Sequence, residues 1–192
     1  MSGDVGRPRD PLEIRPARPD ELLWLQELEA AAGLRFEAVG LAHVAASPPT
    51  ELAELRSACD DGLLFVAAAP ALRAVGFARA VRLAASLHLA EVSVLPSHGR
   101  RGVGSALVRE VARAGEAIAA AALTLSTFSD VPWNAPFYEK LGFRRLREQE
   151  LTPELVEIRR REAVSGLPIE RRVIMGLKLA AGRARRPGRP GD

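Results

Sequence analysis

The sequence predicts an α/β (α+β) domain built on a mixed sheet, and two features of its pattern predict this class. Short apolar runs of strand length alternate with segments whose apolar residues recur at helical spacing. Pro and Gly separate most of these segments, as expected of turns between elements. Strands that alternate with helices in this way are typical of a sheet covered by helices.

The N-terminal part is predicted to hold one short strand and two helices. Leu12–Ile14 is expected to form the strand. A helix then starts with Asp20 as its cap and stops at Gly33, because Asp suits a helix start and Gly a helix end. The apolar residues of this helix follow helical spacing: Leu22, Leu25, Leu28 and Ala32. A second, shorter helix is predicted over Glu51–Cys59.

The middle of the chain is predicted to hold three strands and one long helix. Leu63–Ala68 is a continuous apolar run, Val75–Leu83 is its hairpin partner beyond Pro70, and Leu87–Leu95 follows. The long helix is amphipathic, with one apolar face made by Leu107, Val111, Ala114 and Ile118.

The C-terminal part is predicted to continue the same alternation. Its strands are expected over Leu123–Phe128, Phe143–Glu150 and Arg172–Leu179. Between them lie a short helix, Ala135–Leu141, and a helix that starts with Thr152 as its cap and Pro153 at its first position.

Length and composition predict one domain over residues 11–179, with a flexible leader over 1–10 and a disordered basic tail over 180–192. The formal charge of +3 comes from the tail, and a nucleic-acid partner would rest on that tail alone. No apolar run approaches the ~18–20 residues that span a bilayer, so we expect no membrane partner. Cys59 is the single cysteine, which excludes an internal disulfide and favours a cytoplasmic location.

The most informative segment is the glycine-bearing loop that joins the strand Leu87–Leu95 to the long helix. Glycines let a backbone approach a ligand closely, and free N–H groups at a helix start attract an anion. Gly99 and Gly104 have the spacing of a P-loop, but Ser105 follows directly with no lysine. A dinucleotide fingerprint needs a third glycine where Leu107 stands. Neither of these two nucleotide sites therefore fits.

The same loop resembles the acetyl-CoA loop of the GNAT superfamily of N-acetyltransferases, written Arg/Gln-x-x-Gly-x-Gly/Ala. Gly102 and Gly104 match its two small positions, while Gly99 stands where Arg or Gln is usual. The resemblance implies that backbone amides hold the pyrophosphate of acetyl-CoA and that the preceding strand binds its pantetheine arm. The implied cofactor-binding residues are Val92, Ser93, Val94, Gly99, Arg100, Arg101, Gly102, Val103, Gly104, Ser105 and Asn134.

A second segment, Trp133–Phe143, is similar to the other signature of the superfamily, Asn-x-x-Ala/Pro-x-x-Phe-Tyr-x-x-Leu-Gly-Phe. The resemblance covers roughly residues 63–146. It implies a mostly antiparallel sheet flanked by helices, with acetyl-CoA bound where two central strands splay. It leaves the N-terminal helices and the Thr152–Gly166 insertion undetermined, although these parts usually shape the acceptor pocket.

The resemblance also implies direct attack of an amine on the thioester in a ternary complex, with no acyl-enzyme. Tyr138 occupies the general-acid position, and Asn134 would bind the cofactor arm or cap a helix. The base is either His88 or Glu91, which strict alternation places on opposite faces of their strand. Packing roles remain open for all of these residues. No cluster has metal-ligand spacing, so no metal is expected.

The predicted function is an N-acetyltransferase that moves an acetyl group from acetyl-CoA to a primary amine of a small molecule or peptide. The alternative is an acyl-CoA-binding regulatory protein with the same fold and little catalysis. The sequence leaves the acceptor open, and a homodimer is compatible with it.

Overall fold

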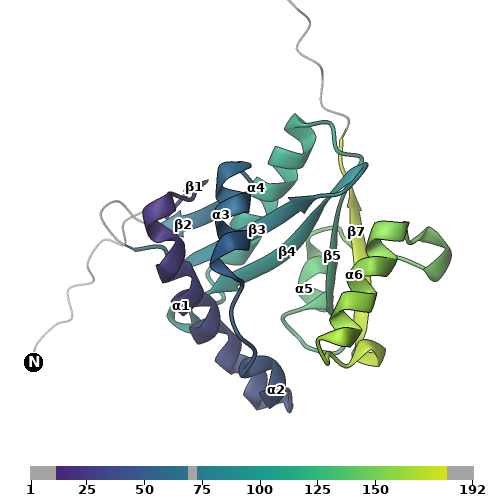
Figure 1. Ribbon diagram of the computed structural model, residues 1–192, viewed down its shortest axis with the longest axis horizontal. Coiled ribbons are helices and arrows are strands. Elements are labelled where there is room, and N and C mark those ends of the chain that lie inside the picture. Colours follow the sequence, from purple (N-terminus) through teal and green to yellow (C-terminus); the bar gives the residue numbers. More distant parts are fainter. Residues whose placement is uncertain (1–11, 69–72, 181–192) are drawn as a thin grey trace, which may run out of the picture. The chain divides into compact units, whose positions relative to one another are not determined.

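The computed structural model describes residues 12–68 and 73–180 (Figure 1). They form two compact units, one made of the described residues up to Val81 with Leu89–Val111, the other of Arg82–His88 and the described residues from Ala112. The predicted leader, all of the predicted tail but Ala180, and the predicted break at Pro70 lie outside the described residues.

Seven strands form one sheet in the order β1-β2-β3-β4-β5-β7-β6. Their bounds are Glu13–Pro16 (β1), Leu64–Ala68 (β2), Gly76–Arg82 (β3), Ser86–Val94 (β4), Ala122–Phe128 (β5), Arg144–Arg145 (β6) and Arg172–Lys178 (β7). Antiparallel pairing joins β1 to β2, β2 to β3, β5 to β7 and β6 to β7. The predicted mostly antiparallel sheet is confirmed.

The start of β4 lies beside β5 in parallel. The Ala121 N–H donates to the Ala85 carbonyl at 2.8 Å, and His88 Nδ1 lies 3.0 Å from Thr124 Oγ1. The sequence offset between partners is the same at both contacts, so the two segments advance in the same direction. The sheet is therefore mixed, as the sequence predicted.

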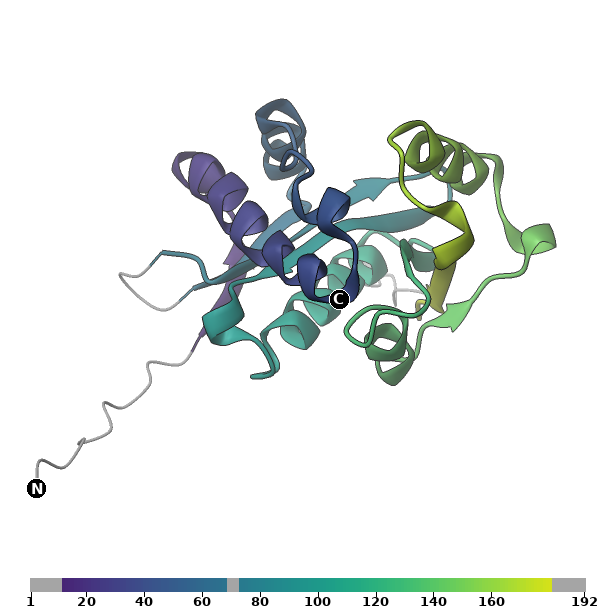
Figure 2. The same ribbon diagram turned by 90° about the horizontal axis from the view of Figure 1, so that it is seen from below.

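The core of the first unit lies between the sheet and the helices α1 (Leu22–Gly33) and α3 (Leu52–Asp60), and the short α2 spans Ala42–Ala45 (Figures 1 and 2). The buried cluster takes residues from both helices, from β2 and β3, and from the approach to β3: Leu22, Leu25, Leu28, Leu55, Ala58, Leu64, Val66, Ala74 and Phe77. The long helix α4 (Val103–Ala117) covers the opposite face, where a Cβ on Gly76 would lie 3.3 Å from the Leu107 side chain. The apolar spacing that predicts α1 thus marks its buried face.

The second unit is built on the β5–β7 pair, which runs from Ala122 opposite Lys178 to Phe128 opposite Arg172. Its helices are α5 (Ala135–Lys140) and α6 (Pro153–Val164). Glu162 joins α6 to both strands: its carboxylate receives Arg172 Nη2 at 2.6 Å and Ser126 Oγ at 2.8 Å. The Arg172 and Glu162 side chains are only 12% and 14% exposed, so this is a largely buried link.

The prediction for the first helix was wrong at its start but right at its end, because α1 ends at Gly33. Asp20 lies inside a 3₁₀ turn, Pro19–Glu21, and Glu21 instead accepts the Arg18 N–H at 2.8 Å. Gly33 keeps helical angles, and a 3₁₀ segment carries the chain on to Gly40, where φ is +73°. The helical segment ends at the glycine whose backbone is left-handed, which only glycine adopts at little cost.

The sequence predicted the long helix and the strand Phe143–Glu150 to extend further than they do. Ile118 is 40% exposed and lies beyond α4, because Ala119 takes a left-handed φ of 56°. The predicted strand Phe143–Glu150 pairs with β7 only over Arg144–Arg145. Glu150 then receives the Arg147 N–H at 2.9 Å and closes a 3₁₀ turn, which takes the chain off the sheet.

Candidate functional site

The glycine loop after β4 leads into a helix start with free backbone donors. The Ala106 N–H donates to the Gly102 carbonyl at 3.0 Å, which makes Gly102 the first acceptor of α4. The N–H groups of Val103, Gly104 and Ser105 therefore have no acceptor within the helix. Together with the helix dipole, such groups attract an anion, and a phosphate is the usual one.

The loop approaches this helix start in a left-handed conformation. The φ angle is 59° at Arg100 and 81° at Gly102. A Cβ on Gly102 would meet nothing within 4 Å, so the backbone angle and not the space requires glycine here. Left-handed residues in a loop turn neighbouring N–H groups toward one point, which is how backbone nests bind anions. Arg100 and Arg101 are exposed and add positive charge.

Gly99 is the departure from the family pattern, and its surroundings are tight. Its N–H donates to the Pro96 carbonyl at 3.2 Å. A Cβ on Gly99 would lie 3.3 Å from the same oxygen. Glycine therefore suits this compact turn, in which Arg or Gln would press against the backbone.

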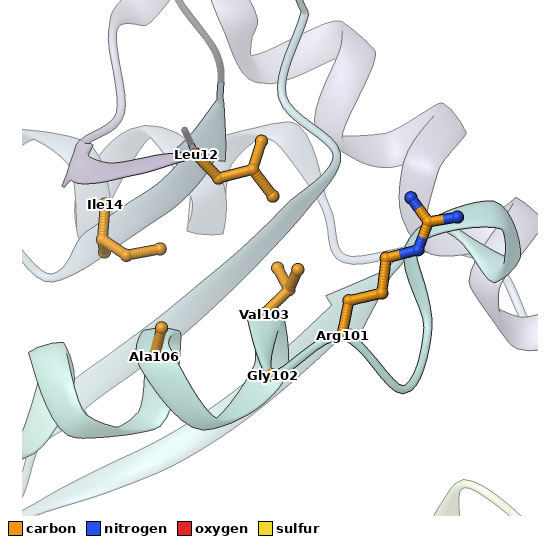
Figure 3. Close-up of a pocket in the computed structure, with 6 residues that line it drawn as sticks. All are labelled: Leu12, Ile14, Arg101, Gly102, Val103 and Ala106. Atoms are coloured by element: carbon orange, nitrogen blue, oxygen red, sulfur yellow. The ribbon is translucent and has the colours of Figure 1, made fainter. Parts of the chain in front are cut away.

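A cavity of about 160 Å³ lies beside the helix start (Figure 3). The residues that line it come from β1 and its approach, the loop and the first turn of α4: Leu12, Ile14, Arg101, Gly102, Val103 and Ala106. The lining is apolar except for Arg101, and it includes none of the predicted catalytic residues. The cavity is therefore not where the chemistry is expected.

The predicted pantetheine-binding strand presents different side chains to its two faces. Val94 faces α4, since a Cβ on Gly76 would lie 3.1 Å from its Cγ2. On the other face the buried Ser93 donates to Glu91 Oε1 at 2.8 Å. Leu95 packs against the α1–α3 core on that same face. Glu91, one candidate base, thus lies on the face covered by α1 and α3.

A second carboxylate in this unit, Glu29 on α1, was not predicted. Its Oε1 accepts the N–H of Thr50 at 3.1 Å and the Thr50 hydroxyl at 3.0 Å. Burial, and then the nearby charge of Glu91, raise the pKa of Glu29 to about 7, while Thr50 and Arg79 oppose the shift. The sequence held one signal: Glu29 stands at i+4 from Leu25 and i+7 from Leu22, on the apolar stripe.

The other candidate base, His88, is a buried residue of the second unit and is only 5% exposed. Its Nδ1 lies 3.0 Å from Thr124 Oγ1, and the Thr124 hydroxyl donates to the Leu87 carbonyl at 3.2 Å. The threonine oxygen therefore accepts from His88, which places the ring proton on Nδ1. His88 is thus joined to β5 by a buried hydrogen bond.

Asn134 and Tyr138 also belong to the second unit. Asn134 occupies the cap position of α5 as predicted, but its side chain makes no capping bond. Its Nδ2 donates instead to Thr127 Oγ1 at 2.8 Å. The Tyr138 ring is half-buried and packs edge-on against Phe137 and Phe143, with centroids 5.0 and 5.6 Å away.

Over 12–68 and 73–180, no group of three or more His, Cys, Asp or Glu side chains could hold a metal ion. Within the same ranges, no helix has both the length and the apolar character needed to cross a membrane.

Residues 60–145 match the family of acetyltransferase (GNAT) domains, and this segment contains both the glycine loop and the Trp133–Phe143 signature. Many solved GNAT structures share the fold. The segment 60–145 is thus a GNAT acetyltransferase domain. The general chemistry of this superfamily is acetyl transfer that depends on an acyl-CoA, and the free donors of α4 lie inside the matched segment.

Three solved structures illustrate the similarity of this chain to others. Rv2747 from Mycobacterium tuberculosis, in complex with CoA and NLQ, is 20% identical, with 88% of this chain and 99% of that chain covered and a TM-score of 0.63. The ribosomal-protein-S18-alanine N-acetyltransferase from Escherichia coli is 20% identical over 90% and 97%, with a TM-score of 0.60. The PaiA N-acetyltransferase from Thermoplasma acidophilum, in complex with coenzyme A, is 16% identical over 87% and 98%, with a TM-score of 0.62.

Proposed function

We propose that this protein transfers the acetyl group of acetyl-CoA to a primary amine of a small molecule or peptide. The observation that carries the proposal is the start of α4, where three N–H groups without an acceptor in the helix follow a left-handed Gly102 in the loop after β4. This site suits a pyrophosphate, because backbone donors at a helix start need no charged partner to bind one. Solved structures with the same fold contain coenzyme A.

The residues of the chain would divide the work as follows. The loop from Gly99 to Ser105 holds the pyrophosphate, and the backbone of Val92–Val94 aligns the pantetheine arm. Asn134 adds a hydrogen bond to that arm. When bound, acetyl-CoA supplies an activated thioester carbon. These residues hold that carbon in a fixed place, where a neutral amine can attack it.

Three proton transfers accompany the reaction. The acceptor ammonium must lose a proton before its nitrogen can attack, and Glu91, on the α1–α3 face, would accept that proton directly or through water. The bond from nitrogen to the carbonyl carbon forms, the nitrogen gives its second proton to water, and the carbon–sulfur bond breaks. Tyr138 then gives a proton to the departing sulfur, whose thiol has an ordinary pKa of about 8.5. Cys59 takes no part, in keeping with its half-buried position against the core.

Other GNAT-fold proteins support an amine as acceptor. The E. coli structure is that of a ribosomal-protein-S18-alanine N-acetyltransferase, and one from Neisseria gonorrhoeae is an N-acetylglutamate synthase complexed with coenzyme A and N-acetyl-glutamate. The first acts on a protein and the second on an amino acid, so either class fits this chain. We place the reaction in the cytoplasm, where a lone cysteine stays reduced.

The proposal is tested by acetyl-CoA turnover against a panel of amines: amino acids, polyamines, aminoglycosides, and peptides with free N-termini or lysines. We expect at least one class to accelerate release of the CoA thiol at least tenfold over buffer. Tight binding of acetyl-CoA without acceleration by any amine would overturn the proposal and favour the acyl-CoA-binding regulatory protein.

A further inference from the structure

The space between α1, α3 and strands β3 and β4 ends in a layer of charged side chains. The apolar cluster fills most of this space, with Leu25 and Leu28 from α1 and Phe77 from β3. Glu29 lies one helical turn beyond Leu25, and Arg79 lies two residues beyond Phe77 on the same face of its strand. The helices therefore cover these charged groups as they cover the core.

Glu91 enters the same layer from β4. It shares a face with Ser93, which donates to it, and with Leu95, which packs against the core cluster. Its charge is close enough to Glu29 to raise the pKa of that carboxyl. Two carboxyl-bearing residues from separate elements thus lie on the same side of the sheet.

The two oxygens of Glu29 have different surroundings. Oε1 accepts two hydrogen bonds from Thr50. Oε2 is buried and has no hydrogen-bond partner among the described residues. A bare carboxylate oxygen is costly to bury, whereas a protonated one is not. The geometry therefore favours a neutral Glu29.

Other charged groups near Glu29 do not cancel the rise in its pKa. From β3, Arg79 lowers the pKa of Glu29, but its Nη2 is paired to Glu54 of α3 at 2.9 Å. On α2, the titratable His43 is exposed. Burial and the charge of Glu91 affect the pKa of Glu29 more than Arg79 does. Glu29 therefore keeps its proton until the pH approaches neutrality.

We propose that Glu29 and Glu91 form a pair that binds one shared proton. In its doubly ionised form this pair accepts the proton of the acceptor ammonium. The inference rests on the proposed function and deepens it by adding Glu29 to the acceptor side of the site. The ammonium gives one proton to the doubly ionised pair, and the neutral amine attacks the thioester carbon. The pair then releases the proton to solvent and is ready for the next acceptor. A group that titrates close to the working pH is the most effective base.

The shared proton is tested without any acceptor, by ¹³C NMR titration of the full-length protein labelled at its glutamate carboxyl carbons. The Glu29 signal is the one missing from Glu29→Gln. We expect it to titrate near pH 7 in the parent and more than one pH unit lower in Glu91→Gln, which removes the neighbouring charge. Titration of Glu29 in the ordinary glutamate range in the parent, or no change in Glu91→Gln, would overturn the shared proton.

The catalytic role is tested by the pH profile of kcat/KM with an amine that the parent acetylates. Glu29→Gln keeps an oxygen that accepts from Thr50 but cannot take a proton, so we expect loss of the acidic limb near pH 7 and a fall of about 10²-fold at pH 8. Thr50→Val removes one bond that lowers the pKa of Glu29, so it should keep the limb and move it to higher pH. Glu27→Gln, an exposed site on the same helix, should match the parent.

An unchanged limb in Glu29→Gln, or equal losses in Glu29→Gln and Thr50→Val, would give Glu29 a purely structural role and overturn the inference. Failure of the proposed function looks different. In that case the parent acetylates no amine, and the catalytic half of the inference falls with it, while the NMR titration still decides whether the two carboxyls share a proton.

Discussion

The Asn134 side chain donates from Nδ2 to Thr127 Oγ1 over 2.8 Å, which ties the start of α5 to the end of β5. Thr127 is only 4% exposed, so the bond is shielded from water. It fixes how the amide of Asn134 is turned, and a fixed amide offers its carbonyl oxygen in one direction. This is the support that a cofactor-binding asparagine needs.

Asn134→Ala should therefore weaken acetyl-CoA binding by about fivefold, the value of one hydrogen bond. Thr127→Val should cause part of the same loss, because Asn134 is then free to turn, and Thr127→Ser should bind like the parent. Isothermal titration calorimetry measures all three. If Asn134→Ala binds acetyl-CoA as tightly as the parent, Asn134 serves only to join α5 to β5.

The glycine loop offers a matched pair of variants. Gly102 and Gly40 are both left-handed, and a Cβ on either would meet no atom within 4 Å. Gly102→Ala and Gly40→Ala should thus each destabilise the fold by about 1 kcal/mol. Only Gly102→Ala should reduce the rise in melting temperature that acetyl-CoA causes, because only it disturbs the helix start.

Gly104→Val is the stronger variant at the same helix start. Its branched side chain stands where backbone is expected to meet pyrophosphate, so the acetyl-CoA-induced rise in melting temperature should disappear. A variant that keeps the full rise would show that the anion site of α4 is not the cofactor site.

Tyr138→Phe should lower kcat by about 10²–10⁴-fold while leaving acetyl-CoA affinity nearly unchanged, as expected for loss of a general acid. The ring packs edge-on against Phe137 and Phe143, and phenylalanine preserves both contacts. Unchanged melting temperature would confirm that the fold is intact. Full turnover in this variant would leave Tyr138 as a packing residue.

The sequence predicted the local structure around the candidate site. The loop with Gly102 and the start of α4 could be predicted because a loop and the helix start after it are built from consecutive residues. Gly33 was correctly predicted as the end of α1, but the sequence did not indicate the 3₁₀ segment that follows and ends at the left-handed Gly40.

Glu29 shows why the rest of the site could not be predicted. Its partners are Thr50, Arg79 and Glu91, which lie 21 to 62 residues away along the chain. Its raised pKa depends on the packing of α1 over β3 and β4, which no local window contains. The one available signal was a carboxylate on the apolar stripe of a helix. A glutamate near the end of a helix can show the same spacing when it is exposed to solvent.

Stability should depend on pH through Glu29. Its pKa is raised to about 7 in the folded protein, and its ordinary value is 4.5, so the folded state binds more protons between these values. The free energy of unfolding should therefore lose a contribution of about 1–3 kcal/mol as pH rises from about 4.5 to about 7. Glu29→Gln removes this contribution.

Urea unfolding at a series of pH values measures the effect. The difference in unfolding free energy between parent and Glu29→Gln should shift in favour of the variant as pH rises from about 4.5 to about 7 and then level off. A difference that stays constant from pH 4.5 to 8 would contradict the raised pKa.

The central claim is that the acetyl group passes directly from acetyl-CoA to an amine, and the fate of a radiolabelled acetyl group tests it most directly. The protein is mixed with labelled acetyl-CoA in slight excess, with and without the best amine of the panel, and protein and small molecules are separated. The account predicts label on the amine when it is present and no label on the protein when it is absent. Label bound covalently to the protein would contradict direct transfer, and label that stays on CoA in the presence of every amine would contradict the acetyltransferase itself.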